Sequence, residues 1–312
     1  MSIRPFRLGV LDLVPQPEGI TAESALAEAS LLARLAEQWG YERYWAAEHH
    51  DLPGLACAAP EVLLSHIGAV TSRIRLGTGA LLLPHYSPLK VAETFHLLSA
   101  LYPGRIDLGI GRAPGGPAHA SMALSGNFLQ RVYGMEESVR SLIQLLGGDY
   151  RYDGQPVSAR PVPQARPELW LLGTGRKSAA YAAANGCGYV FGGFMSDEDG
   201  EAVLSAYREQ FVPSECLKEP RTIVAVNLIC AETSAKAVQL TEESRGFRPD
   251  EEGASRSRHS IAGSPAEVFS ALTKLQKQYQ TEEFLIGTPI SDYEQRRESY
   301  RLLAAYMTEL KH

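Results

Sequence analysis

Cysteine is scarce in the sequence, and none of the spacings typical of cysteine-based sites occurs. The four cysteines, Cys57, Cys187, Cys216 and Cys230, are scattered, without a CxxC pair and without the spacing of a zinc site. A metal site of this kind is therefore not indicated. A reducing cytoplasm is the simplest location for a protein with this cysteine usage.

Long apolar runs and an excess of positive charge are also missing. No run approaches the ~20 apolar residues that a membrane helix needs. The N-terminal apolar run is interrupted by Asp12 and lacks a small-residue cleavage site, which predicts a first strand rather than a signal peptide. The net charge of −6 argues against non-specific attraction to nucleic acid or to anionic membranes.

The sequence does contain a regular alternation of apolar and helical segments. Near-continuous apolar runs are typical of parallel strands that are buried on both faces. The predicted strands span residues 7–13, 43–47, 74–83, 105–110, 168–172, 188–192, 222–231 and 283–287. The predicted helices span residues 21–40, 59–72, 87–104, 130–147, 176–186, 197–211, 264–279 and 292–310.

Eight strands that alternate with helices over 312 residues predict an α/β fold, a (β/α)8 TIM barrel. A doubly wound open sheet is the competing arrangement, since strand number alone does not exclude it. No internal repeat or linker is evident, so we expect one domain over residues 1–312. Two insertions interrupt the alternation. Ala113–Asn127, after the fourth strand, is rich in glycine and proline and predicts a substrate-side loop, and Gly246–Ser260, after the seventh, is polar and charged.

A glutamate and two histidines, Glu48, His49 and His50, follow the second strand. In a barrel, side chains at the carboxyl ends of the strands surround the active site. Strand alternation sends the two histidines to different sides, so only one of them is expected to face a pocket. That histidine could accept or donate a proton near neutral pH. The alternative is a structural histidine that bonds to a neighbouring helix.

Two further segments suit the binding of an anion. In LLGTGRKSAAYAAANG (171–186) a strand ends at a glycine pair and a helix begins near Arg176, so that free amide groups and the hydroxyl of Ser178 could hold a phosphate. Arg112 follows the fourth strand directly, and Arg131 could join it on the same anion. The alternatives are an ordinary glycine turn and surface arginines that bond to carboxylates. Glycines 77 and 79, inside a strong strand, predict a bulge or a close approach.

Four segments, taken in order, resemble the bacterial luciferase-like flavin monooxygenases. They are AAEHH (46–50), RLGTGALLLP (75–84), GRIDLGIGRAPG (104–115) and LLGTGRKSAAYAAANG (171–186), and the resemblance extends from the first strand to GSPAEV (263–268). It implies a TIM barrel that binds reduced FMN at the carboxyl end of the strands. A separate flavin reductase supplies the FMN, which then reacts with molecular oxygen. Members commonly form homodimers through the helices after strands 2 and 3.

The resemblance also assigns roles to individual residues. His49 matches the active-site histidine, and Gly79 and Ala80 match a non-prolyl cis peptide beside the flavin ring. Arg112 and Arg131 match the phosphate-binding arginines. Gly175 and Ser178 match the phosphate-binding turn and hydroxyl, and Thr174 belongs to the same cofactor-binding turn.

Three departures argue against light emission. Gly111 stands where the luciferases carry a reactive cysteine, Thr174 stands where they have a glutamate, and the stretch 246–260 is shorter than their mobile loop. We therefore expect a flavin-dependent monooxygenase that acts on a small organic substrate. The alternatives are a deazaflavin (F420)-dependent hydride-transfer enzyme on the same fold and a flavin-binding protein without turnover.

Overall fold

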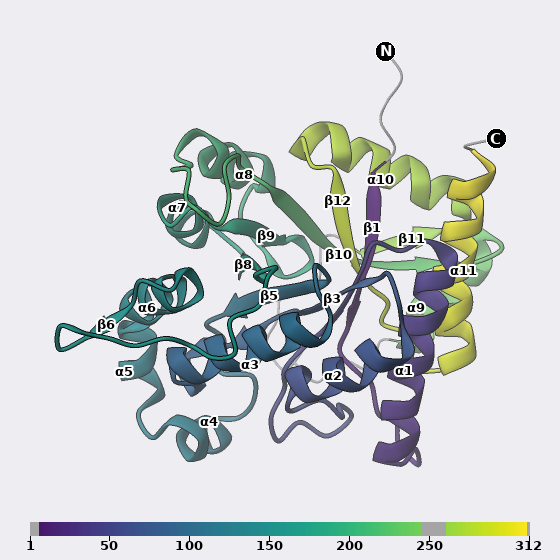
Figure 1. Cartoon of the computed structure of the whole chain (residues 1–312). Coiled ribbons are helices and arrows are strands. Elements are labelled where there is room, and N and C mark those ends of the chain that lie inside the picture. Colours follow the sequence, from purple (N-terminus) through teal and green to yellow (C-terminus); the bar gives the residue numbers. More distant parts are fainter. Residues whose placement is uncertain (1–5, 245–259, 311–312) are drawn as a thin grey trace.

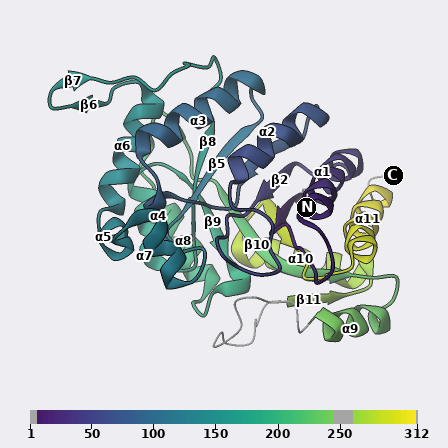
Figure 2. The same cartoon turned by 90° about the horizontal axis from the view of Figure 1, so that it is seen from below.

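Parallel strands close into a barrel surrounded by helices, in a computed structural model that describes residues 6–244 and 260–310 (Figures 1 and 2). Each barrel strand is parallel to its neighbours, and the last strand pairs with the first, which closes the ring. In order around the ring, the strands are β1 (Arg7–Asp12), β2 (Arg43–Ala46), β3 (Arg75–Thr78) with β4 (Leu81–Leu82), β5 (Ile106–Gly111), β8 (Glu168–Gly173), β9 (Gly188–Gly192), β10 (Thr222–Cys230) and β12 (Glu283–Gly287). The predicted (β/α)8 barrel is confirmed.

The helices lie outside the ring of strands, as the alternating sequence pattern predicts (Figure 2). Those that cover the barrel are α1 (Ala22–Trp39), α2 (Pro60–Val70), α3 (Pro88–Leu101), α6 (Met135–Gly147), α7 (Arg176–Ala184), α8 (Gly200–Glu209), α9 (Ser234–Glu243), α10 (Pro265–Tyr279) and α11 (Tyr293–Glu309). Helix α1 illustrates how local chemistry sets the ends. Thr21 accepts the N–H of Ser24 at its start, and Gly40, at φ 84°, ends it.

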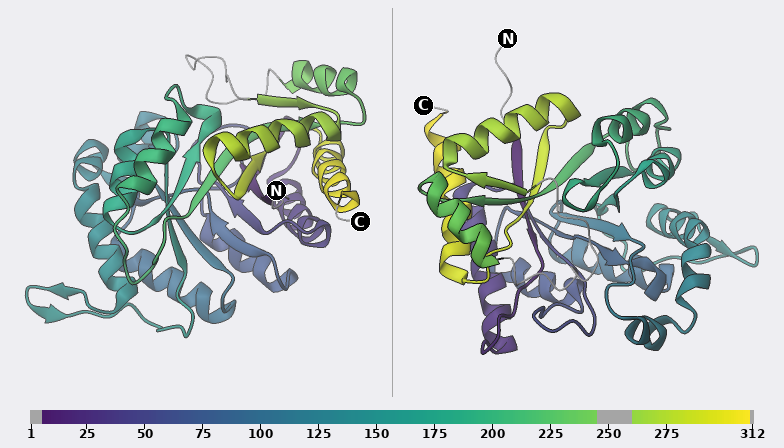
Figure 3. Two further views of the ribbon diagram at one scale, coloured as in Figure 1. Left: turned by 90° about the horizontal axis from the view of Figure 1, so that it is seen from above. Right: turned by 180° about the vertical axis from the view of Figure 1, so that it is seen from behind.

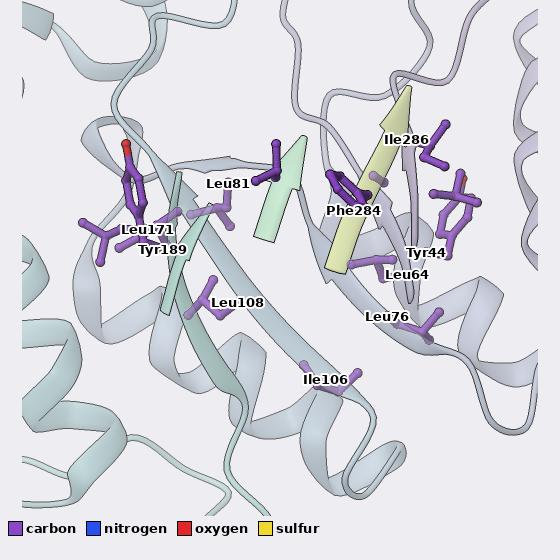
Figure 4. Close-up of a cluster of buried hydrophobic side chains, with 14 of the residues drawn as sticks. Tyr44, Leu64, Leu76, Leu81, Ile106, Leu108, Leu171, Tyr189, Phe284 and Ile286 are labelled. Atoms are coloured by element: carbon purple, nitrogen blue, oxygen red, sulfur yellow. The ribbon is translucent and has the colours of Figure 1, made fainter. Parts of the chain in front are cut away.

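Alternation along the strands separates the core outside the barrel from the core inside it. On β5, Ile106 and Leu108 belong to the large cluster between the barrel and its helices, which Figure 4 shows with Tyr44, Leu76 and Phe284. A smaller cluster fills the barrel interior. Its members are Leu11, Trp45, Trp170, Val190, Ile223, Ala225 and Leu285. The barrel is therefore packed rather than open along its axis.

The amino-terminal end of the barrel is closed by buried ion pairs. Arg43, 1% exposed, binds Asp107 at 2.6 Å and also binds Glu283. The guanidinium groups of Arg43 and Arg221 lie 5.2 and 5.0 Å from the ring centre of Trp170. Burial acts to raise the pKa of Asp107, but Arg43 and a second arginine outweigh it and hold that pKa below its usual value. Charged side chains thus seal this end.

Two predictions about the segment after β5 were wrong in part. Ala113–Asn127 is not simply a loop, because α4 (Ala118–Ser125) forms within it. The prediction followed the glycines and prolines of the segment, whereas its central stretch is alanine-rich and favours a helix. The helix predicted over 130–147 is two helices, α5 (Phe128–Tyr133) and α6, which are interrupted at Gly134.

Two further elements were not predicted. Strands β6 (Arg151–Tyr152) and β7 (Gln155–Pro156) form a hairpin that projects from the barrel (Figure 3). Asp153 and Gly154, both at positive φ, make its turn, and such an Asp-Gly pair is a known hairpin indication.

Strand β11 (Ser260–Gly263) pairs with β10. The predicted insertion Gly246–Ser260 otherwise lies outside the described residues. No helix within 6–244 or 260–310 is long and apolar enough to cross a membrane.

Candidate functional site

Four neighbouring strands lead to the predicted site residues at one rim of the barrel. β2, β3, β5 and β8 are consecutive and parallel, so their carboxyl ends meet at the same end. His49 follows β2, the Gly79–Ala80 pair follows β3, Arg112 follows β5 and Thr174 follows β8. This rim is the end opposite the Arg43 ion pairs. Topology therefore brings together segments that are far apart in the sequence.

The predicted non-prolyl cis peptide between Gly79 and Ala80 is present. The close approach predicted for this strand is also confirmed, because a methyl group built on Gly79 would lie 2.5 Å from Cδ1 of Leu11. On the neighbouring strand, a methyl group built on Gly111 would lie 2.9 Å from Cβ of Ala80. Neither position could therefore take a larger side chain without a shift of its neighbours.

A buried carboxylate connects the histidine segment to the chain that follows the cis peptide. Oε1 of Glu48 lies 2.7 Å from Nε2 of His50 and accepts the hydroxyl of Tyr86 at 3.0 Å. Oε2 accepts the backbone N–H of Leu82 at 2.9 Å. Burial raises the pKa of Tyr86, and the charge of Glu48 raises it further. Glu48 thus holds three groups that belong to two different loops.

The two histidines have different surroundings. His49 is half-buried, and its backbone N–H donates to the carbonyl of Cys57 at 2.9 Å. The backbone N–H of His50 donates to the carbonyl of Gly115 at 2.7 Å, which fastens the loop after β5 to the loop after β2. The ring of His50 therefore belongs to the Glu48 network, as the i, i+2 spacing along an extended chain allows.

An aromatic row continues from His50 and was not predicted. The rings of His50 and His85 meet edge to face with centres 5.8 Å apart. The ring of His85 lies 5.2 Å from that of Phe128, on α5. His85 ends the short helix η1 (Leu83–His85). No local pattern marks His85, Tyr86 or Phe128, because their contacts depend on loops that only the closed barrel brings together.

Arg112 and Arg131 are both exposed, and neither guanidinium makes a hydrogen bond or ion pair with another residue in the described ranges. Within the described residues, therefore, neither arginine bonds to a surface carboxylate, as the alternative would require. Arg131 lines a cavity of about 860 Å³ between the start of α3, helix α6 and the β6–β7 hairpin. Arg112 is not among the residues that line this cavity. This cavity therefore does not bring the two arginines together.

The turn between β8 and α7 is held by its own hydrogen bonds. The hydroxyl of Ser178 donates to the carbonyl of Gly175 at 2.7 Å and lies 3.0 Å from the hydroxyl of Tyr189. Burial raises the pKa of Tyr189 to about 12. The carbonyl of Thr174 accepts the hydroxyl of Ser196 at 2.6 Å. The predicted turn and hydroxyl are thus brought together at the start of α7.

A carboxylate that was not predicted lies at this helix start. Oε2 of Glu198 accepts the backbone N–H of Arg176 at 3.0 Å. A methyl group built on Gly175 would overlap Oε1 of Glu198. The first amide groups of a helix attract anions, and here a side chain of the protein supplies one. Local sequence could not show this contact, because Glu198 comes after the next strand.

Comparison with known proteins agrees with this geometry. The model of the luciferase-like monooxygenase family matches residues 6–305. A luciferase-like monooxygenase of Escherichia coli (strain K12) is 34% identical over 99% of both chains. An N-acetyl-S-alkylcysteine monooxygenase of Bacillus subtilis (strain 168) is 36% identical over 96% of this chain and 97% of its own length. The crystal structure of apo-MsnO8 covers 97% of this chain and 98% of its own, with 35% identity and a TM-score of 0.86. The chain therefore belongs to the luciferase-like monooxygenase family.

Proposed function

We propose that the protein is a flavin-dependent monooxygenase that uses reduced FMN and molecular oxygen on a small organic substrate, without light emission. One observation carries the proposal. The histidine pair, the Gly79–Ala80 cis peptide, Arg112 and the start of α7 follow the carboxyl ends of four consecutive strands. A flat molecule with an anionic end could contact all four segments at once.

The residues at this rim fit the phosphate of FMN. The guanidinium of Arg112 is exposed and has no protein partner within the described residues. The absent side chain of Gly175 leaves a space at the start of α7 that can hold an anion, and the carboxylate of Glu198 occupies it in this structure. A guanidinium and the N-terminus of a helix are two of the groups that proteins use to bind phosphate. In this proposal Gly175, Ser178 and Arg112 hold the phosphate, and Arg131 approaches it from α5.

The isoalloxazine ring would lie against Ala80 and Gly111, where the contact between the two strands leaves no room for a larger side chain at position 111. Reduced FMN supplies the two electrons that allow one oxygen atom of O₂ to enter the substrate and the other to become water. His49 accepts or donates the accompanying proton. Glu48 keeps the neighbouring loop in place, and the apolar interior below the ring excludes water.

The relatives suggest where to begin the search for a substrate. One of them is named as an N-acetyl-S-alkylcysteine monooxygenase. Thioethers are therefore the first class of substrate that we propose to test. The decisive assay supplies reduced FMN and isotopically labelled oxygen to the purified protein, with a panel of thioethers and other small organic molecules. We expect labelled oxygen in a product, and we expect His49→Ala to abolish this incorporation while FMN still binds.

Two results would contradict the proposal. Tighter binding of a deazaflavin than of FMN, together with hydride transfer and no incorporation of oxygen, would favour the F420-dependent alternative. Binding of FMN without turnover on any substrate, unchanged in His49→Ala, would favour a protein that only binds flavin.

We also propose a homodimer that forms through α2 and α3. Val62 and Leu101, which are 65% and 54% exposed on these helices, support it, because large apolar side chains on a surface favour protein contact. Sedimentation equilibrium should give the mass of a dimer at micromolar protein. A monomer mass would contradict this part of the proposal.

A further inference from the structure

A carboxylate of the protein lies where the proposed function places the cofactor phosphate. Glu198 accepts the N–H of Arg176 at 3.0 Å, and the same carboxylate lies in the space that the missing side chain of Gly175 leaves. These contacts involve different oxygen atoms of the carboxylate. One anion of the protein is therefore built into the turn that precedes α7.

The backbone that carries Glu198 is fastened to the same turn. Ser196 donates its hydroxyl to the carbonyl of Thr174 and accepts the N–H of Glu198 at 3.1 Å. The next residue, Asp199, caps helix α8 and accepts the N–H of Glu201 at 3.1 Å. The side chain of Glu198 is nevertheless exposed. The carboxylate can therefore leave the turn by rotation about its own side-chain bonds while the backbone stays in place.

We propose that Glu198 is a specificity-determining residue that competes with the cofactor phosphate for the N-terminus of α7. The inference rests on the proposed function, because it takes the phosphate of FMN as the competing anion. A phosphate and a carboxylate cannot both accept the single N–H of Arg176. Two anions side by side at the start of one helix would also repel each other. FMN must displace the carboxylate, whereas a flavin that lacks a phosphate need not.

Such a competitor suits a cofactor that binds and leaves repeatedly. If a separate reductase delivers reduced FMN, as the family resemblance implies, the oxidised form must depart after each turnover, and a very tight complex would slow the cycle. Arg112 attracts the phosphate and Glu198 opposes it. The balance of these two side chains then sets the affinity of the site for phosphorylated flavins.

The test compares two flavins and three proteins. The dissociation constants of oxidised FMN and of riboflavin are measured by fluorescence titration for the wild type, Glu198→Gln and Asp197→Asn. Asp197 is the matched control, because it is an exposed neighbouring carboxylate that makes no hydrogen bond or ion pair with a described residue. We expect Glu198→Gln to bind FMN about 3- to 10-fold more tightly, as suits the loss of one exposed charged competitor. The affinity of Glu198→Gln for riboflavin should be unchanged. Asp197→Asn should bind both flavins with the affinity of the wild type.

The outcomes separate this inference from the proposed function. The competition is overturned if Glu198→Gln binds FMN no more tightly than the wild type does, or if its affinity for riboflavin rises by the same factor. In either case, FMN binding by the wild type still supports the proposed function. If neither the wild type nor any variant binds FMN, the proposed function fails and the inference fails with it. Inorganic phosphate gives an independent measure, because it should inhibit FMN binding at lower concentration in Glu198→Gln than in the wild type.

Discussion

Oε1 of Glu48 lies 2.7 Å from Nε2 of His50, with the carboxylate buried at 2% exposure. A carboxylate oxygen accepts hydrogen bonds, so Nε2 of His50 carries the hydrogen and the ring is held in one orientation. The two histidines of the EHH segment therefore differ in role. His50 belongs to a structural network, and the proposed function assigns proton transfer to His49 instead.

Replacement of Glu48 should destabilise the protein. Glu48→Ala would leave the N–H of Leu82, the hydroxyl of Tyr86 and the ring of His50 without their acceptor, and we expect the free energy of unfolding to fall by about 2–4 kcal/mol. Urea denaturation measures the loss. Tyr86→Phe removes only one of the three bonds and should cost about 1 kcal/mol. Equal stability of Glu48→Ala and wild type would contradict the network.

Arg112 should contribute to cofactor binding and not to stability. Because its guanidinium has no partner in the described part of the chain, Arg112→Ala should change the free energy of unfolding by no more than about 0.5 kcal/mol. FMN should bind about 10- to 100-fold more weakly, since a charge-assisted bond to phosphate is lost. Riboflavin affinity should be unchanged. Arg34→Ala, on the exposed face of α1, is the control and should bind both flavins normally.

Arg131 provides a separate test of the predicted phosphate site. If it reaches the phosphate from α5, Arg131→Ala should also weaken FMN binding, by about 10-fold. Unchanged FMN affinity would instead assign Arg131 to the cavity that it lines beside α6 and the hairpin. The same titrations as for Arg112 give the answer.

A methyl group on Gly175 should weaken FMN binding with little effect on folding. The added carbon would meet the flexible end of Glu198, which can move away, and φ at Gly175 is −161°, an extended conformation open to any residue. The same carbon would occupy the space proposed for the phosphate. Gly109→Ala is the contrast, because its methyl would overlap the backbone carbonyl of Thr78 and should destabilise the protein by about 2 kcal/mol or more. Thermal unfolding and FMN titration distinguish the two effects.

The ion pairs at the amino-terminal end should make stability depend on acid pH. Burial alone would raise the pKa of Asp107, but Arg43 and Arg75 lower it below its usual value. A lowered carboxyl pKa stabilises the fold above the unfolded pKa of about 4, and this contribution is lost as the pH falls through the lower folded value. Asp107→Asn should cost about 3–5 kcal/mol at neutral pH. The difference in the free energy of unfolding between Asp107→Asn and the wild type should become smaller below about pH 4. A difference that does not change with pH would contradict the lowered pKa of Asp107.

The sequence was sufficient to predict the barrel but not all of the helices and strands that are added to it. Apolar runs such as 222–231 predicted buried parallel strands, because burial on both faces leaves few polar positions in the strand. Composition misled at Ala118–Ser125, where a short alanine-rich helix lies between glycine- and proline-rich ends. The Asp153–Gly154 pair indicates a hairpin turn, but the predicted strands did not include the two short strands that flank it.

The position of a candidate site residue was predictable where the residue directly follows a strand. His49, Arg112 and the glycine turn at 173–175 each come directly after a strand, so a parallel barrel had to bring them to one rim. Glu198 and His85 were not predictable in this way. Their contacts join segments that approach one another only after the ring of strands has closed, and no local spacing records such a contact.

A crystal structure of the protein soaked with FMN tests most directly whether one rim of the barrel holds both ends of the cofactor. We predict the ring against Ala80 and Gly111, and the phosphate between Arg112 and the start of α7, with the carboxylate of Glu198 turned away. A flavin bound at the Arg43 end of the barrel, or one with its phosphate in the cavity beside α6 and far from Gly175, would contradict the proposed site.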